Sequence, residues 1–409
     1  MIRVAVVGVG GYGSSLIDGL RKAGQRGLCR LVAAADARLD ALADRAEALA
    51  REGVQLYDDA AGMFADQRGR CEAVYIASSI PTHAPLTVAA ARCGYHVHLE
   101  KPPAATVQEI DEMLAALDAA GRMCLVGFQA FHGHMRLIVE ALAAGRLGRV
   151  ERITCAAGWP RNRDYYARND WAGRFRTGPA WVLDGPVTNA LAHQLAHMLA
   201  MAAGRPGALA RPAAVRAELY AAGDVESHNT AAIEVRTAEG PIIHFFCSHA
   251  TAGMFGPQIE VFAERARAVY HPNDGSTIFW NDGPAEKPQG TDDAQDEMIA
   301  NFLDAVAAAA PARLRCPLAE TRKYTLALDG AHESSGRVHR IAGEHFRVEQ
   351  AGTGEQHVVV EGLDDAIAAA NRQGKLFSDL PQRPAWAVAT EPFDLADYRR
   401  FPQRFQCAG

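Results

Sequence analysis

The motif Glu100-Lys101-Pro102-Pro103 places one lysine in a setting where an amine could exchange a proton. Lysine is scarce, since only 5 of the 42 basic residues are lysines. The prolines restrict the backbone at Lys101 and so limit where the amine points. An amine that is partly desolvated and close to another positive charge has a lowered pKa, so its neutral form can accept a proton from a hydroxyl group. A surface lysine paired with Glu100 is the alternative, and the spacing alone leaves both open.

Asn189 and His193 form a second pair that could act on a substrate hydroxyl. Residues four apart lie on one face of a helix, which the pattern predicts over 189–203. A histidine can serve as acid or base, whereas an amide orients a hydroxyl but exchanges no proton. A packed His193 is the alternative. His193 and His197 also have zinc-ligand spacing, but Gln194 replaces the glutamate of H-E-x-x-H and no third ligand is evident, so we expect no metal.

A glycine-rich turn, Gly8-Val-Gly10-Gly11-Tyr12-Gly13, follows an apolar run and precedes a helical pattern. Such glycines allow a tight turn, the close approach of a pyrophosphate and close packing of helix on strand. Asp36 ends the next apolar run, where a carboxylate accepts hydrogen bonds from a ribose 2′-hydroxyl and repels a 2′-phosphate. NAD is therefore favoured over NADP. Arg38 keeps NADP as the less favoured cofactor, because its guanidinium could pair with that phosphate.

The elements that must position these residues change in rhythm near Gly127. Before it, short apolar runs alternate with helical patterns, which predicts a doubly wound parallel α/β sheet, a Rossmann domain over 1–127. After it, consecutive extended runs predict an open, mostly antiparallel sheet in a second α/β domain over 128–409. The further expected elements are helices over 134–144, 292–309, 318–335 and 363–373, strands over 215–220, 230–237, 242–248 and 258–263, and a hairpin pairing 344–349 with 357–361.

The glycine turn, Asp36, the loop Ala77–His83 and Glu100-Lys101-Pro102 together resemble the Gfo/Idh/MocA family of NAD(P)-dependent oxidoreductases. The resemblance implies a Rossmann domain followed by an α/β domain, oxidation of a sugar, inositol or polyol hydroxyl or the reverse reduction, and a homo-oligomer, dimer or tetramer, formed through the outer face of the second sheet. It makes Lys101 the proton-transfer residue. The residues expected at the cofactor are Gly8, Gly10, Gly11, Tyr12, Gly13, Asp36, Arg38, Ser78, Ser79, Pro81, His83, Glu100, Lys101 and Gln129.

The family's Asp-x-x-x-His motif aligns with Asn189-x-x-x-His193, or places its aspartate at Asp184 with Thr188 at the histidine position. The segment Gly158–Gly178 is rich in aromatic residues and arginine, and we expect it to hold the substrate, because aromatic faces stack on sugars while charged groups fix hydroxyls or an acidic group. An ordinary packed loop is the alternative. The expected substrate-binding residues are Trp159, Arg163, Tyr165, Trp171, Asp184, Asn189 and His193.

Composition excludes several classes of function. The net charge is -6 and no basic run occurs, which argues against nucleic-acid binding. No apolar stretch reaches the roughly 18 to 20 residues that cross a bilayer. The first residues do not follow the pattern of a signal peptide, and the 8 cysteines are widely spaced, so we expect a cytoplasmic protein with reduced thiols.

The sequence therefore predicts an NAD-dependent dehydrogenase of carbohydrate metabolism that acts on CH–OH groups of a sugar, polyol or glycoside. Asn189, where the family has an acid, leaves a sensor or regulatory protein that binds NAD without turnover as the alternative. A metal hydrolase built on His193 and His197 is a third class. Family members that cleave glycosides carry a Gly-Gly-His-His segment, which this sequence lacks.

Overall fold

The computed structural model describes residues 1–129, 131–290, 293–350 and 356–407, which fall into two compact units. The first unit comprises Met1–Ala104, Gln108–Gly133 and the described part of Thr291–Thr321. The second comprises Ala105–Val107, His134–Gly290 and the described part of Arg322–Gly409. Within the described ranges, no helix combines the length and the apolar character needed to cross a membrane.

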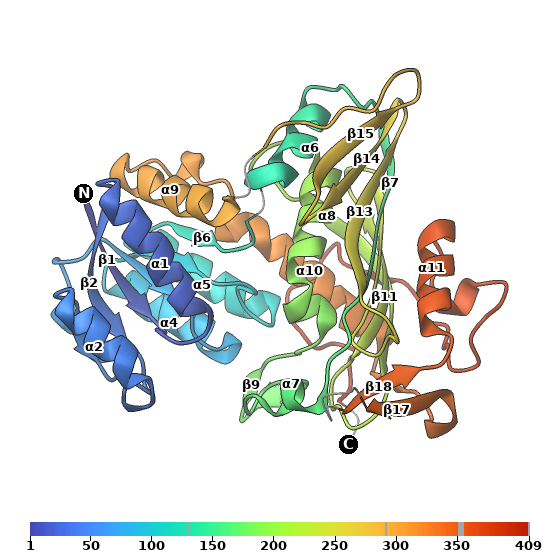
Figure 1. Ribbon diagram of the computed structural model, residues 1–409, viewed down its shortest axis with the longest axis horizontal. Coiled ribbons are helices and arrows are strands. Elements are labelled where there is room, and N and C mark those ends of the chain that lie inside the picture. The colour runs from blue at the N-terminus through green and yellow to red at the C-terminus, as the bar shows by residue number, and fades with distance from the viewer. Residues whose placement is uncertain (130, 291–292, 351–355, 408–409) are drawn as a thin grey trace. The chain divides into compact units, whose positions relative to one another are not determined.

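The first unit is built on a six-stranded sheet in the order β3-β2-β1-β4-β5-β6 (Figure 1). Every pairing in it is parallel, which confirms the predicted Rossmann sheet. The strand order reverses between β1 and β4, and at such a switch point open α/β sheets bind their ligands beyond the carboxyl ends of the strands. The strands are β1 (Ile2–Val7), β2 (Cys29–Ala35), β3 (Gln55–Tyr57), β4 (Ala73–Ile76), β5 (His96–Leu99) and β6 (Cys124–Val126).

Helices cover both faces of this sheet, because right-handed crossovers leave β1 in one direction and β4 in the other. One helix comes from much later in the chain: Ile299 lies so close to Gly19 on α1 that a Cβ at Gly19 would come within 2.6 Å of its side chain. Residues 293–321 thus pack with the N-terminal residues, although the sequence-based boundary placed them after residue 127. The helices are α1 (Tyr12–Gln25), α2 (Ala43–Arg51), α3 (Ala60–Asp66), α4 (Ile80–Arg92), α5 (Val107–Ala120) and α9 (Ala294–Ala307), with 3-10 turns at Asp40–Leu42 and Pro311–Arg313.

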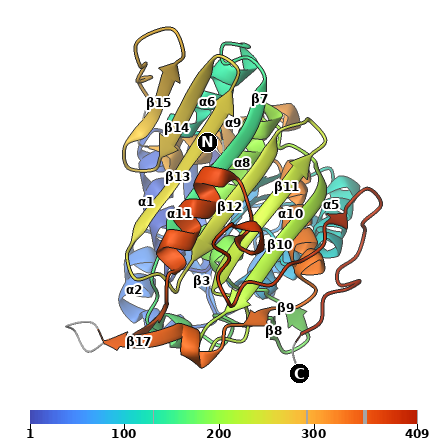
Figure 2. The same ribbon diagram turned by 90° about the vertical axis from the view of Figure 1, so that its right-hand side faces the viewer.

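The second unit is built on a nine-stranded sheet in the order β15-β14-β13-β7-β12-β11-β10-β16, with β19 also paired to β10 (Figure 2). The pairs β7–β12 and β10–β16 are parallel and the others antiparallel, which confirms a mostly antiparallel sheet. The strands are β7 (Val150–Gly158), β10 (Pro212–Ala221), β11 (Thr230–Thr237), β12 (Ile242–Ser248), β13 (Phe255–Ala263), β14 (Ala266–His271), β15 (Gly275–Trp280), β16 (His339–Arg340) and β19 (Phe393–Asp394). Two hairpins, β8 (Arg176–Thr177) with β9 (Ala180–Trp181) and β17 (Phe346–Gln350) with β18 (Gln356–Val360), lie outside it, and the second of them was predicted.

Helices lie on opposite faces of the large sheet, with α8 on one and α11 on the other (Figures 1 and 2). On the α11 face, the part of the chain that follows α11, called the C-terminal segment below, forms an apolar layer. Its Trp386 lies edge-on to Tyr220, at 5.0 Å between ring centroids, and to Phe377, at 5.4 Å. These rings join Phe246 and the buried residues of α11 in one core cluster. The helices of this unit are α6 (Gly133–Ala143), α7 (Arg163–Ala167), α8 (Ala192–Ala203), α10 (Leu318–Ser335) and α11 (Leu363–Gln373), with 3-10 turns at Gly343–His345 and Phe377–Asp379.

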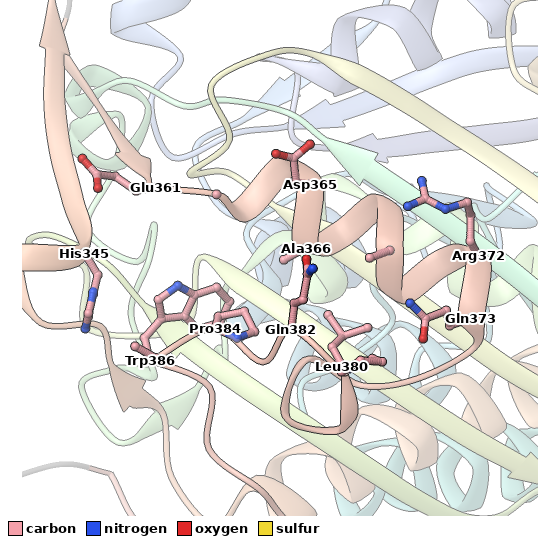
Figure 3. Close-up of a pocket in the computed structure, with 14 residues that line it drawn as sticks. His345, Glu361, Asp365, Ala366, Arg372, Gln373, Leu380, Gln382, Pro384 and Trp386 are labelled. Carbon is pink, nitrogen blue, oxygen red and sulfur yellow. The ribbon is translucent and has the colours of Figure 1, made fainter.

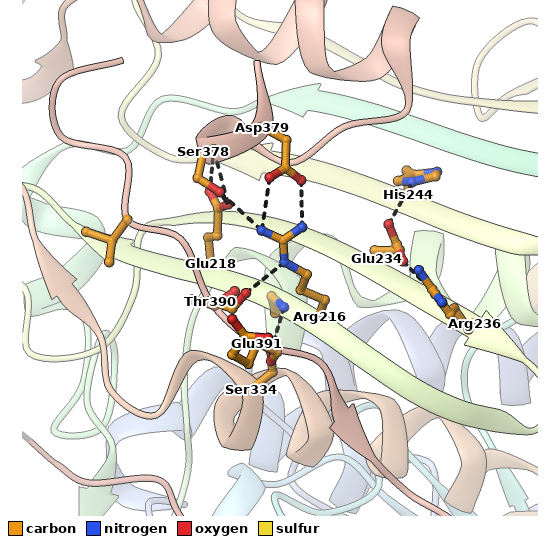
Figure 4. A network of polar contacts seen from close by, with 12 residues as sticks. Arg216, Glu218, Glu234, Arg236, His244, Ser334, Ser378, Asp379, Thr390 and Glu391 are labelled. Carbon is orange, nitrogen blue, oxygen red and sulfur yellow. Dashed lines mark hydrogen bonds and ion pairs between the residues drawn. The ribbon is translucent and has the colours of Figure 1, made fainter. Parts of the chain in front are cut away.

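A polar network fixes the C-terminal segment to the same face (Figure 4). The buried carboxylate of Glu218 accepts hydrogen bonds from the backbone N–H and the hydroxyl of Ser378 and from the hydroxyl of Tyr220. The guanidinium of Arg216 pairs with Asp379 at 2.6 Å. Since the buried carboxylate has several donors, these contacts specify where the segment docks as well as stabilising it.

We expect Phe377→Ala to destabilise the second unit, because it removes a fully buried ring that contacts Trp386. Loss of such a ring costs about 3 to 5 kcal/mol. Val348→Ala is the control, since that side chain is 58% exposed on β17 and should change the unfolding free energy by less than about 0.5 kcal/mol. Urea denaturation followed by tryptophan fluorescence measures both, and equal midpoints for the two variants would show that the C-terminal layer does not stabilise the sheet.

Candidate functional site

The glycine turn joins β1 to α1 through contacts that leave no room for side chains. Gly8 has φ +90, and a Cβ there would lie 2.4 Å from the carbonyl oxygen of Ala77. A Cβ at Gly13 would lie 2.0 Å from the carbonyl oxygen of Gly8. Gly11, by contrast, has φ +51 and faces open space, and no side chain caps the first turn of α1. Because the N–H groups of a helix N-terminus bind anions, the turn fits the pyrophosphate of a dinucleotide.

Asp36 stands at the end of β2 with its carboxylate held beside this turn. Its two oxygens accept hydrogen bonds from the backbone N–H groups of Val9 and Arg38, each at 2.9 Å. A carboxylate has further lone pairs, so ribose hydroxyls can still donate to it. Two guanidinium groups lie close by: that of Arg45 donates to the carbonyl of Val9 at 2.9 Å, and that of Arg38 lies 3.9 Å from where a Cβ on Gly10 would stand. The residues present therefore fit the adenosine end of NAD.

Lys101 follows the end of β5 in the same sheet, next to a buried carboxyl group. Glu100 is 7% exposed and accepts the backbone N–H of Lys101 at 3.2 Å. Its other oxygen lies against Gly127, where a Cβ would come within 2.6 Å. Burial raises the pKa of Glu100 to about 7, and attraction to Lys101 opposes part of that rise. The backbone N–H of Lys101 is thus held by a carboxyl group that has little access to water.

His83 also holds the backbone next to Lys101, through the carbonyl group of Pro102. It is buried, and its ring nitrogens lie 2.8 Å from the carbonyl oxygen of Pro102 and 3.1 Å from that of Ser78. Burial lowers the pKa of His83, so the ring is neutral and its single N–H donates to one of the two carbonyls. The ring of His83 ties the loop after β4 to the segment after β5, and its expected place at the cofactor remains a prediction.

The other residues expected at the cofactor lie around the carboxyl ends of the strands. Ser78 and Thr82 share a hydrogen bond between their hydroxyls at 2.6 Å, and Ser79 and Pro81 stand at the start of α4. Gln129 has φ +54, a conformation that is rare for a residue other than glycine, and its side chain hydrogen-bonds with Tyr12 in the glycine turn. The prediction that these residues contact NAD remains a prediction.

In the second unit, Asn189 does not lie on the helix that carries His193. Residues Pro186–Ala190 form a π-helical turn, Leu191 interrupts it, and α8 begins only at Ala192. The expectation of one continuous helix from residue 189 was wrong, because the Asn189 amide donates to Asp184 Oδ1 at 3.0 Å and holds the turn in its own geometry. The other oxygen of Asp184 accepts the backbone N–H of Gly173 at 2.7 Å. The buried Asp184 thus binds the protein's own groups and organises this loop, and its expected contact with the substrate remains a prediction.

His193 is partly exposed near the start of α8, and its ring centroid lies 6.0 Å from that of His197. His197 is buried and meets the ring of Tyr270 edge-on at 5.6 Å between centroids. Over residues 1–129, 131–290, 293–350 and 356–407, no group of three His, Cys, Asp or Glu side chains is placed to hold a metal ion. His193 is thus partly open to solvent, whereas His197 is part of the core.

The aromatic segment before α8 forms a stack of rings and guanidinium groups. Two arginines pack against the ring of Tyr165, with the guanidinium carbon of Arg168 at 3.7 Å and that of Arg161 at 4.9 Å from its centroid. The guanidinium carbon of Arg161 also lies 5.3 Å from the ring centroid of Trp159, and that of Arg168 lies 5.3 Å from the ring centroid of Trp171. The structure thus brings together three of the expected aromatic residues.

The arginines of this stack are not the one expected from the sequence. Arg163 is exposed on α7, while Arg161 and Arg168 make the contacts. The two stacked arginines lie seven positions apart on either side of a short helix, so no local periodicity marks them. From the sequence, these two arginines could be recognised only as basic residues close to Trp159 and Trp171.

A pocket of about 670 Å³ opens on the α11 face of the second unit (Figure 3). Carboxylates of Glu361 and Asp365, the guanidinium of Arg372 and the indole of Trp386 line it. None of the residues predicted for the cofactor or the substrate takes part in it. The pocket is therefore separate from the groups described above.

Two protein-family models match this chain. Residues 2–128 match the model of the oxidoreductase family with an NAD-binding Rossmann fold, Gfo/Idh/MocA, and residues 135–269 match a Gfo/Idh/MocA C-terminal domain. Together the two models cover more than half of the chain.

Two curated relatives are similar over part of their length. The myo-inositol 2-dehydrogenase of Thermotoga maritima is 29% identical over 167 residues, which are 40% of this chain and 48% of that protein. The inositol 2-dehydrogenase of Rubrobacter xylanophilus is 35% identical over 167 residues, 40% of this chain and 45% of that protein. The matched region thus spans less than half of either relative. Among solved structures, the WlbA dehydrogenase from Bordetella pertussis in complex with NADH and UDP-GlcNAcA has the same fold, with a TM-score of 0.67, 21% identity, and coverage of 81% of this chain and 94% of that one.

We expect Asp36→Ala to bind NADPH at least about tenfold more tightly than the unchanged protein does, and NADH about tenfold less tightly. The carboxylate that repels a 2′-phosphate and accepts the ribose hydroxyl is lost, while the guanidinium groups of Arg38 and Arg45 remain. Fluorescence titration with NADH and NADPH measures both affinities. Asp118→Ala on the exposed side of α5 makes the same charge change and should alter neither. Unchanged affinities in Asp36→Ala would remove Asp36 from the cofactor site.

The pKa of Glu100 predicts a fall in stability with rising pH. The folded protein holds this carboxyl group protonated up to about pH 7, whereas its ordinary value is 4.5, so the folded form binds more protons between these values. Stability from this group is present below about pH 4.5 and is lost as the pH rises to about 7, by on the order of 3 kcal/mol. Glu100→Gln should remove that part of the pH dependence in urea denaturation, and Glu112→Gln on exposed α5 should not. Identical pH profiles for the two variants would contradict the burial argument.

Proposed function

The chain belongs to the Gfo/Idh/MocA oxidoreductase family, and from this premise we propose that it is an NAD-dependent dehydrogenase of a sugar, an inositol or a related polyol. The similarity to two inositol 2-dehydrogenases supports this substrate class. The expected homo-oligomer stays a prediction. On one face of the second sheet, α11 and the C-terminal segment cover part of the surface (Figure 2).

One observation carries the proposal: the glycine turn and Lys101 lie at the same edge of one parallel sheet. The glycine turn follows β1 and Lys101 follows β5, and β4 alone separates these strands. Neighbouring strands are about 4.8 Å apart, so the two sites lie about 10 Å apart across the sheet. That is within the length of a dinucleotide whose pyrophosphate rests on the turn.

When bound there, NAD supplies a nicotinamide ring that accepts a hydride. The amine of Lys101 accepts the proton of the substrate hydroxyl as the C–H bond of the same carbon breaks, which leaves a carbonyl group. Glu100 and His83 hold the backbone of Lys101 and so fix the position of the amine. His193 is the second group proposed to exchange a proton or hydrogen-bond with the substrate. Asn189 is proposed to act through the loop that it holds with Asp184.

The alternative is an NAD-binding sensor without turnover, and the amide side chain of Asn189 is the observation that supports it. This amide exchanges no proton and already donates to Asp184. Such a protein would bind NADH but produce none from any sugar, inositol, sugar acid or glycoside.

We expect Lys101→Met to lower kcat by on the order of 100-fold to 10,000-fold, because a general base contributes that much to the rate. Binding of NADH should stay within about threefold, since the glycine turn and Asp36 are unchanged. NADH absorbance with myo-inositol and a panel of polyols and sugar acids measures turnover, and fluorescence titration measures binding. Lys375→Met, at an exposed lysine of the second unit, is the control. Near-normal turnover in Lys101→Met on an identified substrate would remove the lysine from proton transfer.

A further inference from the structure

The arginine stack around Tyr165 holds more positive charge than its surroundings balance. Arg168 lies 4.0 Å from Asp184, but this carboxylate is shared with the Gly173 N–H and the Asn189 amide. Arg161 has no carboxylate within ion-pair distance among the residues that the structure describes. The stack thus has an excess of one positive charge, which a bound anion would offset.

Arg161 also has hydrogen-bonding capacity that the protein does not use. Its Nε is buried and lacks a hydrogen-bond partner within the described chain, while one of its terminal nitrogens donates to the carbonyl of Pro160 at 3.4 Å. Five N–H donors in a planar fork suit the oxygens of a carboxylate or a phosphate. Stacking on Tyr165 and Trp159 holds the fork in one plane, so binding would cost little side-chain entropy.

A buried histidine faces the same positive charges. His249 is 3% exposed, its Nδ1 lies 3.2 Å from the hydroxyl of Tyr166, and its Nε2 has no hydrogen-bond partner among the described residues. Burial, and then repulsion from Arg161 and Arg168, lowers the pKa of His249 to about 3, so it does not add a charge of its own. A neutral ring with an unused nitrogen offers a further polar contact beside the two guanidinium groups.

This stack is connected to the residues proposed to meet the substrate. Arg168 contacts Asp184, Asp184 holds Asn189, and the turn that contains Asn189 leads directly into α8 and His193. These contacts connect the arginines to His193, one of the groups proposed to meet the substrate.

We propose that Arg161 and Arg168 make this protein selective for an anionic carbohydrate, a sugar or polyol that carries a carboxylate or a phosphate. This rests on the proposed dehydrogenase function and narrows its substrate class. The aromatic rings contact the carbohydrate, and the two guanidinium groups bind its charged group.

Binding to the complex with NADH tests this without turnover. Isothermal titration calorimetry compares D-glucose, D-glucuronate and D-glucose 6-phosphate. These sugars differ only at C6, which carries a hydroxyl group, is a carboxylate, or carries a phosphate. At least one charged sugar should bind at least tenfold more tightly than glucose. Preference for glucuronate identifies a carboxylate site, and preference for glucose 6-phosphate identifies a phosphate site.

Arg161→Met keeps an apolar side chain against Tyr165 and should reduce the preference for the charged sugar to below threefold. Arg174→Met, an exposed arginine of the same segment, should keep it. Glucose binding as tightly as both charged sugars, no binding of either charged sugar at 10 mM, or an unchanged preference in Arg161→Met would each overturn the inference. Turnover of a neutral polyol that depends on Lys101 would still support the dehydrogenase function, so the two can fail separately.

Discussion

The close approach of α1 to β1 is the constraint on which the first unit depends. A Cβ at Gly13 would lie 2.0 Å from the carbonyl oxygen of Gly8, a separation that no side chain tolerates. Glycine at both positions lets the helix start directly at the end of the central strand. Its N-terminus then points to the edge where β4 and β5 also end, and where Lys101 stands. The anion-binding end of a helix and an amine capable of proton exchange come to one sheet edge for this reason.

The residues that hold Lys101 in place cost stability. Glu100 is buried with a raised pKa, so the fold is less stable at neutral pH than an apolar side chain there would make it. His83 is buried as a neutral ring between two carbonyl groups. Strain or destabilisation of this kind is common where side chains must be held in one geometry for function.

Local patterns made the first unit predictable and left parts of the second unpredicted. The glycine turn, Asp36 and Glu100-Lys101-Pro102 lie at strand ends, where residue type and position along the chain fix their surroundings. The helix expected from residue 189 was wrong because its geometry depends on Asp184 in the preceding loop. Strands β7, β14 and β15 were not predicted, since β7 ends in alanine and glycine and the other two are short runs with polar residues. The stacking of Arg161 and Arg168 on Tyr165 depends on tertiary structure, so no spacing in the sequence marks it.

Transfer of isotope from substrate to cofactor tests the dehydrogenase assignment most directly. The protein would be incubated with NAD and either ring-deuterated myo-inositol or ring-deuterated D-glucuronate, and the recovered cofactor analysed by mass spectrometry and proton NMR. We expect deuterium at C4 of the nicotinamide from at least one substrate, and its transfer to be slower by on the order of 100-fold to 10,000-fold in the Lys101→Met variant. A cofactor that binds but acquires no deuterium from either compound would contradict the assignment.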